Sequence, residues 1–69
     1  MPRRLRKQLA EFLRQRRGAT PYAEFARKLG VSSSSLQRME MGEQNVTLDT
    51  LDEIASRLKC SVADIFVDP

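Results

Sequence analysis

Apolar residues recur at helical spacing along almost the whole chain, and three glycines interrupt the pattern. The first stretch ends at Gly18 and places its apolar residues at the i, i+4, i+7 and i+8 positions of one helix face, namely Leu5, Leu9, Phe12 and Leu13. No run alternates with a period of two, and no Asn-Gly or Asp-Gly pair marks a hairpin. The pattern therefore predicts a chain built from helices alone.

Polar capping residues divide the rest of the chain into four more helices. The predicted caps stand where each new apolar stretch begins, at Thr20, Ser32, Thr47 and Ser61. Pro21 takes the first helical position that proline favours, and a third helix is expected over roughly residues 33–41, although four consecutive serines also fit a flexible linker. Five short helices joined by loops of about two to six residues form a compact all-α bundle. We expect a single domain over residues 1–69.

The two parts of the chain carry opposite net charges. Residues 1–38 hold ten Lys or Arg against two Glu, a net charge of +8. Residues 39–69 hold two basic residues against seven acidic ones, a net charge of −5. Such asymmetry indicates that the basic part faces a polyanion, the alternative being a merely solvated basic surface.

The residue types that most catalytic sites require are scarce. The chain has no histidine and one cysteine, Cys60, which excludes an intramolecular disulfide, a zinc site of the usual Cys/His kind and histidine acid–base catalysis. The acidic residues at 49, 52 and 53 fall in the first turns of the predicted fourth helix, where the helix dipole favours them. No apolar run approaches the roughly 18 residues that span a bilayer, and nothing argues for export. We therefore expect a cytoplasmic protein that is not an enzyme and needs no metal or cofactor.

The segment from Phe25 to Gly42 combines two predicted helices with a tight turn at Gly30. A short turn of this kind makes the helices cross steeply and leaves the second projecting from the surface. If Leu36 points inward, a rotation of about 100° per residue turns four residues outward: Ser34, Gln37, Arg38 and Met41. Arginine can hydrogen-bond guanine with two donors and glutamine can pair with adenine, although a solvated helix face is equally consistent with this chemistry.

Four segments then stand in a fixed order: LRQRRG at 13–18, FARKLGVS at 25–32, LQRMEMG at 36–42 and TLDTL at 47–51. Together they resemble the lambda-repressor-like helix-turn-helix domain, also called the Cro/cI or XRE type, over about residues 5–66. The resemblance implies a five-helix bundle that binds DNA sequence-specifically, most simply as a transcriptional repressor occupying an operator. Its recognition helix, at about 33–41, would lie in the major groove.

By position, the resemblance also implies roles for single residues. Base edges would be read by Ser33, Ser34, Gln37 and Arg38. Phosphates would be approached by Ser35, by the start of the second helix around Tyr22, and by the loop residues Gln44 and Asn45. A basic arm over residues 1–7, with Arg3, Arg4, Arg6 and Lys7, precedes the family domain and can lie along phosphates or in a minor groove. Lys59 departs from the family pattern, because it occupies the usual glycine position before the last helix.

Glu40 shares the predicted inward face of the third helix with Leu36, and a buried charge needs a partner. The resemblance names Arg14 as that partner, whereas a helical wheel of the first segment places Arg16 nearer the apolar face. We predict a structural ion pair between Arg14 and Glu40. Met39 and Cys60 are expected to pack in the core.

Double-stranded DNA is the expected partner, and a homodimer is expected to bind it. The terminal apolar residues Val62, Ile65, Phe66 and Val67 are candidates for the dimer contact, with Phe66 expected in the core. A protein-interaction module, such as the antitoxin of a toxin–antitoxin pair, is the alternative function and would bind a protein partner. Membrane binding by the basic amphipathic first segment is disfavoured, since its apolar face is needed to build the bundle.

Overall fold

The computed structural model describes residues 3–66, and within them the chain is helical with no strand. Five helices follow in order: α1 (Arg3–Arg17), α2 (Tyr22–Leu29), α3 (Ser33–Glu40), α4 (Leu48–Arg57) and α5 (Val62–Ile65). The predicted all-α class is confirmed. The stretch of four serines begins α3 and is not a linker, because the first of them caps the helix and Leu36 anchors it in the core.

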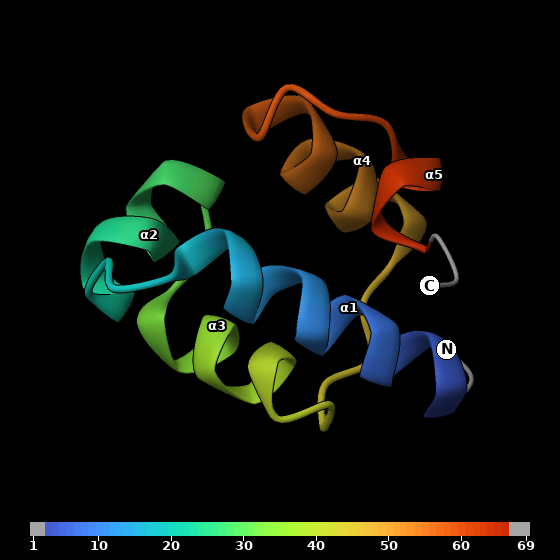
Figure 1. Ribbon diagram of the computed structural model, residues 1–69, viewed down its shortest axis with the longest axis horizontal. Coiled ribbons are helices and arrows are strands. Elements are labelled where there is room, and N and C mark those ends of the chain that lie inside the picture. The colour runs from blue at the N-terminus through green and yellow to red at the C-terminus, as the bar shows by residue number, and fades with distance from the viewer. Residues whose placement is uncertain (1–2, 67–69) are drawn as a thin grey trace.

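α1 runs through the middle of the molecule (Figure 1). It packs against α3 on one side and against α5 on the other, while α2 packs against both α3 and α4. The largest fully buried side chains come from the first four helices and form one core: Leu9, Leu13, Leu29, Leu36, Met39 and Ile54. α3 is thus held by α1 and α2, and its opposite face is left to solvent.

Three of the four predicted N-caps are confirmed by hydrogen bonds. The side-chain oxygens of Ser32, Thr47 and Ser61 accept from the backbone N–H three residues ahead, at 3.0, 3.1 and 3.3 Å. At α5 the Asp64 carboxylate accepts in return from the Ser61 backbone N–H at 2.9 Å, which completes a capping box. The hydrogen bonds from the Ser61 backbone and hydroxyl lower the pKa of Asp64.

The predicted cap at Thr20 is wrong, because α2 begins one residue later than expected. Pro21 has an extended backbone, with φ −59° and ψ 148°, and its carbonyl accepts the first helical hydrogen bond, from Phe25. The Thr20 carbonyl is instead used by the guanidinium of Arg17, at 3.0 Å. The N-terminus of α2 therefore has no side-chain cap.

The chain leaves α4 through a left-handed residue that is not glycine. Lys59 has φ 57°, and it is the one non-glycine residue with positive φ within residues 3–66. The backbone N–H of Cys60 donates to the Ala55 carbonyl at 2.9 Å, and that of Lys59 donates to Ser56 at 3.1 Å. These two bonds are the Schellman motif, in which glycine normally supplies the left-handed conformation. The expectation that this position suits glycine is borne out by the backbone itself.

Replacing this lysine should stabilise the fold. Lys59→Gly removes a left-handed penalty of about 1–2 kcal/mol and adds a glycine entropy loss of about 0.5–1 kcal/mol, so the net gain lies between about 0 and 1.5 kcal/mol, centred on about 0.8 kcal/mol. Urea unfolding measures the change. Lys28→Gly, within α2, is the matched control and should lower stability by about 1 kcal/mol. A loss of stability in both variants would contradict the assignment of strain to Lys59.

Candidate nucleic-acid interface

The outward face of α3 carries the residues predicted to read bases. The side chains of Leu36 and Met39 are 0% and 1% exposed, so this side of the helix is fixed against the core. Ser33 is half-buried on the flank. The remaining residues of the predicted face are exposed, as the helical wheel indicated: Ser34, Gln37, Arg38 and Met41.

A short turn sets the position of α3 against α2. Gly30 takes a left-handed conformation with φ 78°, and the Val31 N–H donates back to the Ala26 carbonyl at 3.0 Å. Ser32 then caps α3 at once, so only residues 30–32 separate the two helices. Phe25 and Leu29 are buried beneath the turn. The result is a helix, a tight turn and a projecting second helix, as predicted.

A buried ion pair holds the far end of α3. The guanidinium of Arg17 binds both carboxylate oxygens of Glu40, with Nε to Oε2 at 2.8 Å and Nη2 to Oε1 at 3.1 Å. The Glu40 side chain is 2% exposed and that of Arg17 is 19% exposed. The hydrogen bond to Glu40 raises the pKa of Arg17, a group that is charged at neutral pH in any case.

The same guanidinium also fixes the start of α2. Its Nη1 donates to the Thr20 carbonyl at 3.0 Å, and its carbon lies 3.9 Å from the centre of the Tyr22 ring. The planar group thus bonds on two edges and stacks on one face, a geometry that suits arginine better than lysine. One side chain therefore joins the end of α1, the start of α2 and the end of α3.

The predicted pairing of Arg14 with Glu40 is wrong, and Arg17 is the partner. Arg14 donates instead to the backbone carbonyl of Glu40. Leu9, Leu13 and Arg17 stand four residues apart and share one face of α1, so Arg17 continues a stripe of buried leucines. Arg14 is about 100° away from Leu13 on the helix. The spacing could have identified Arg17, because the stripe is visible in the sequence.

Basic residues of α1 flank the C-terminal end of α3. Arg3, Lys7 and Arg14, here called the α1 strip, line one shallow cleft together with Met41 and Gly42. All three basic residues are exposed. The expectation of a separate arm over residues 1–7 is not met from Arg3 on, because Leu5 extends the helical pattern and α1 begins at Arg3. Met1 and Pro2 lie outside the described residues.

The other residues predicted to approach phosphates are spread over three helices and one loop. Tyr22 is half-buried at the first position of α2, beside Arg17. Ser35 is half-buried in the first turn of α3, where its N–H bonds the Ser32 cap. Asn45 is exposed in the loop after α3, and Arg4 is exposed on α1 outside the cleft that the α1 strip lines. Arg3 therefore lines the cleft at the end of α3 and Arg4 does not, while Tyr22 contacts Arg17, the partner of Glu40.

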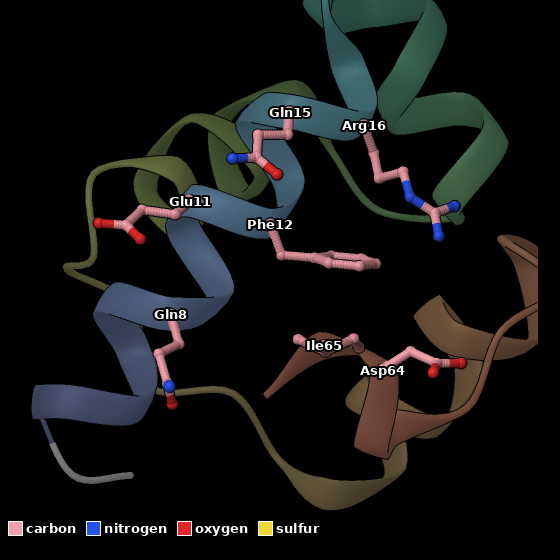
Figure 2. Close-up of a pocket in the computed structure, with 7 residues that line it drawn as sticks. All are labelled: Gln8, Glu11, Phe12, Gln15, Arg16, Asp64 and Ile65. Atoms are coloured by element: carbon pink, nitrogen blue, oxygen red, sulfur yellow. The ribbon is translucent and has the colours of Figure 1, made fainter. Parts of the chain in front are cut away.

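A second hollow lies between α1 and α5 (Figure 2). Figure 2 shows the Phe12 ring projecting from α1 toward Ile65 and Asp64 on α5. Arg16 lies over this ring, 4.9 Å from its centre, which agrees with its predicted place near the apolar face of the first helix. The Asp64 carboxylate is already used by the capping box. This hollow is a seam between two helices and carries none of the predicted site residues.

Two further properties bear on the classes of site the protein can hold. Within residues 3–66, no three His, Cys, Asp or Glu side chains are grouped so that they could hold a metal ion. Over the same part of the chain, no helix has both the length and the apolar character to cross a membrane. Cys60 is a half-buried thiol that packs against the core, as expected.

The sequence comparison decides the family. The model of the helix-turn-helix family matches residues 11–65, which include all of α2, the turn and α3. The chain belongs to this family. The helix-turn-helix domain is of the Cro/cI or XRE type, and the protein is a DNA-binding transcription regulator, from a family that is not typically enzymatic. No curated protein and no solved structure matches the chain.

Breaking the buried ion pair should destabilise the helix-turn-helix domain. Glu40→Gln keeps the shape of the side chain but removes the charge, and we expect a loss of about 1.5–3 kcal/mol, the range for hydrogen bonds to charged groups. Urea unfolding gives the value. Glu53→Gln is the control, because it breaks the exposed Glu53–Arg57 pair and should cost less than about 0.5 kcal/mol. Equal losses of unfolding free energy in the two variants would show that burial does not make the Glu40 pair more stabilising than the exposed one.

Proposed function

We propose that the regulator recognises a specific operator by placing α3 in the major groove and represses transcription by occupying that operator. The observation that carries the proposal is the exposed face of α3, which offers Gln37 and Arg38 next to a basic cleft. An amide and a guanidinium can each make two hydrogen bonds to one base edge. Ser33 and Ser34 each add one hydroxyl at the start of the helix.

The surroundings of α3 supply the donors that phosphates need. Arg3 and Lys7 stand beside its C-terminal end, and Asn45 lies in the loop that follows it. The N-terminus of α2 has no side-chain cap, which leaves its first N–H groups for a phosphate near Tyr22. Contacts of this kind fix the orientation of a protein on the duplex, and base contacts then read the sequence.

The charge distribution supports the same orientation. The part with a net charge of +8, residues 1–38, contains α1, α2 and nearly all of α3. The part with a net charge of −5 contains α4 and α5, which lie on the other side of α1 from α3 (Figure 1). Repulsion between phosphates and the acidic helices is therefore weak when α3 faces the DNA. A regulator of this kind works in the compartment that holds the DNA, consistent with the cytoplasmic expectation.

Binding to duplex DNA should weaken steeply with salt, and Arg38 should carry base preference. An operator is first selected from a random duplex pool, and its affinity is measured across a salt series. The logarithm of affinity should fall with slope of about −0.9 per neutralised phosphate. Arg38→Ala should cost about 1–3 kcal/mol and relax the preference at one base pair.

Arg3→Ala is the matched control for this measurement. It should weaken all duplexes alike and reduce the salt slope by about 1, since it removes one phosphate contact. A flat salt dependence would contradict DNA binding through the basic part. If Arg38→Ala also weakened every sequence equally, Arg38 would be a phosphate contact and not a base reader.

We also propose that two copies bind one operator. One recognition helix reads only a few base pairs, and this class of domain gains affinity from two helices one DNA turn, roughly 34 Å, apart. An apolar groove between the starts of α1 and α4 and the last helix offers the contact; it is lined by Leu5, Val46, Thr47, Leu48, Leu51, Val62 and Phe66. Leu48, on this groove, is 80% exposed. A two-fold dimer needs a self-complementary patch, and a protruding leucine beside an apolar groove is one.

The residues first predicted for this contact are only partly available. Val62 and Phe66 are half-buried, pack against the core and line the groove. Ile65 is 3% exposed and belongs to the core, so it cannot form the contact. Val67 lies outside the described residues. Leu48, which was not among the predicted contact residues, is the most exposed apolar residue of this surface.

Leu48→Asp should prevent two copies from binding one operator. Sedimentation with a palindromic duplex should show two wild-type chains per duplex and one chain of the variant. The fold should keep its stability within about 0.5 kcal/mol, because the side chain is exposed. Ser56→Asp, an exposed α4 position outside the groove, is the matched control and should leave two chains per duplex.

A wild-type protein that stays at one chain per two-half-site duplex would overturn the dimeric mechanism. The groove would then be open to a different protein, which is the arrangement that the antitoxin alternative requires. That outcome would leave the salt dependence and the role of Arg38 untouched, so the two parts of the proposal are tested separately.

A further inference from the structure

One of the proposed base readers has a side-chain partner before any DNA is bound. The Nε–H of Arg38 donates to Oε1 of Gln44 at 3.1 Å. Arg38 is exposed on α3, and Gln44 is half-buried in the loop that follows the helix. Gln37, the other long side chain on this face, has no hydrogen-bonded partner among residues 3–66. The two readers therefore differ in how firmly they are held.

The loop reaches Arg38 because of the way α3 ends. Gly42 takes a left-handed conformation with φ 72°, and the N–H of Glu43 donates back to the carbonyl of Arg38 at 3.0 Å. The chain thus folds back on the last turn of α3. Gln44, one residue further, comes beside the guanidinium of Arg38. The position of Gln44 follows from the helix end and not from a chance surface contact.

The chemistry of this bond suits a base reader. It uses the single Nε–H, and guanine can be bound by the Nη1 and Nη2 groups at the tip of the fork. The acceptor is a neutral amide, although the acidic Glu43 is its neighbour in the chain. The full positive charge of Arg38 is therefore kept for the DNA, where a carboxylate partner would have offset it.

We propose that Gln44 is a specificity-determining positioning residue, which holds the Arg38 guanidinium in its base-reading orientation before the operator binds. The proposal rests on the function proposed for α3. A long side chain that is already oriented loses less conformational freedom on binding, so the contact is stronger only where the correct base is present. The resemblance implied that Gln44 touches the DNA backbone, whereas the role proposed here is exerted through Arg38.

The test compares the selected operator with a duplex changed at the base pair that Arg38 reads. Gln44→Ala should weaken binding to the operator by about threefold to tenfold, the equivalent of ordering one long side chain. Binding to the changed duplex should stay within twofold or so, and the salt slope should not change because no phosphate contact is lost. The discrimination between the two duplexes therefore falls.

Two further variants separate positioning from a direct contact. Gln44→Glu keeps an acceptor for Nε, so it should retain the discrimination while weakening both duplexes through repulsion from phosphates. Asn45→Ala, the neighbouring loop residue, should weaken both duplexes equally. In Arg38→Ala the further change Gln44→Ala should add no loss of discrimination, since the two residues act as one unit.

The free protein gives a readout that does not depend on DNA. The Nε–H resonance of Arg38 should show slowed exchange with water in the wild type and in Gln44→Glu, and faster exchange in Gln44→Ala. Equal weakening of both duplexes by Gln44→Ala, with Arg38→Ala still relaxing one base pair, would overturn the positioning role and leave the proposed function standing. If Arg38→Ala relaxes no base pair, the reader assignment fails and the role of Gln44 fails with it.

Discussion

The ion pair between Arg17 and Glu40 fixes the position of α3, the helix proposed to enter the major groove. A carboxylate that is 2% exposed cannot be left without a partner, so the end of α3 cannot move away from α1 without exposing or orphaning a charge. The same guanidinium holds the Thr20 carbonyl and the Tyr22 ring. Any shift of α3 would therefore disturb the start of α2 as well, because Arg17 couples the two helices.

This pair supplies orientation more than stability. Buried ion pairs can often be replaced by apolar residues of similar volume with no loss of stability, because desolvation offsets the attraction. Two parallel hydrogen bonds, however, accept one relative rotation of the partners, whereas an apolar contact tolerates sliding. The main contacts of α3 are with α1 and α2. Packing on this one side fixes the rotation of α3 less firmly than packing on all sides would. We infer that the pair sets the direction in which Gln37 and Arg38 point.

The sequence predicted the helix caps and the buried helix faces, and it did not predict the hydrogen bonds between side chains of different elements. Three N-caps and the inward face of α3 follow from spacing and capping preference, and the resemblance pointed to the glycine position that Lys59 occupies. The partner of Glu40 was predicted as Arg14 from the resemblance, although Arg17 continues the i, i+4 stripe of Leu9 and Leu13; the further contacts of Arg17 with Thr20 and Tyr22 depend on how the helices pack. The bond between Arg38 and Gln44 also needs the path of the loop, which the left-handed turn at Gly42 sets.

The first turns of α1 line both the apolar groove proposed for dimerisation and the basic cleft proposed for DNA binding. Leu5 lines the apolar groove, while Arg3 and Lys7 line the cleft beside α3. A dimer formed through the groove would bring two copies of these basic turns toward its two-fold axis. Like charges repel, and the repulsion is strongest when no anion lies between them. In the proposed dimer, phosphates at the centre of an operator would relieve this repulsion, and the apolar contact would have its full effect only on DNA. If the proposed dimer forms, two copies would therefore pair on the operator and separate away from it.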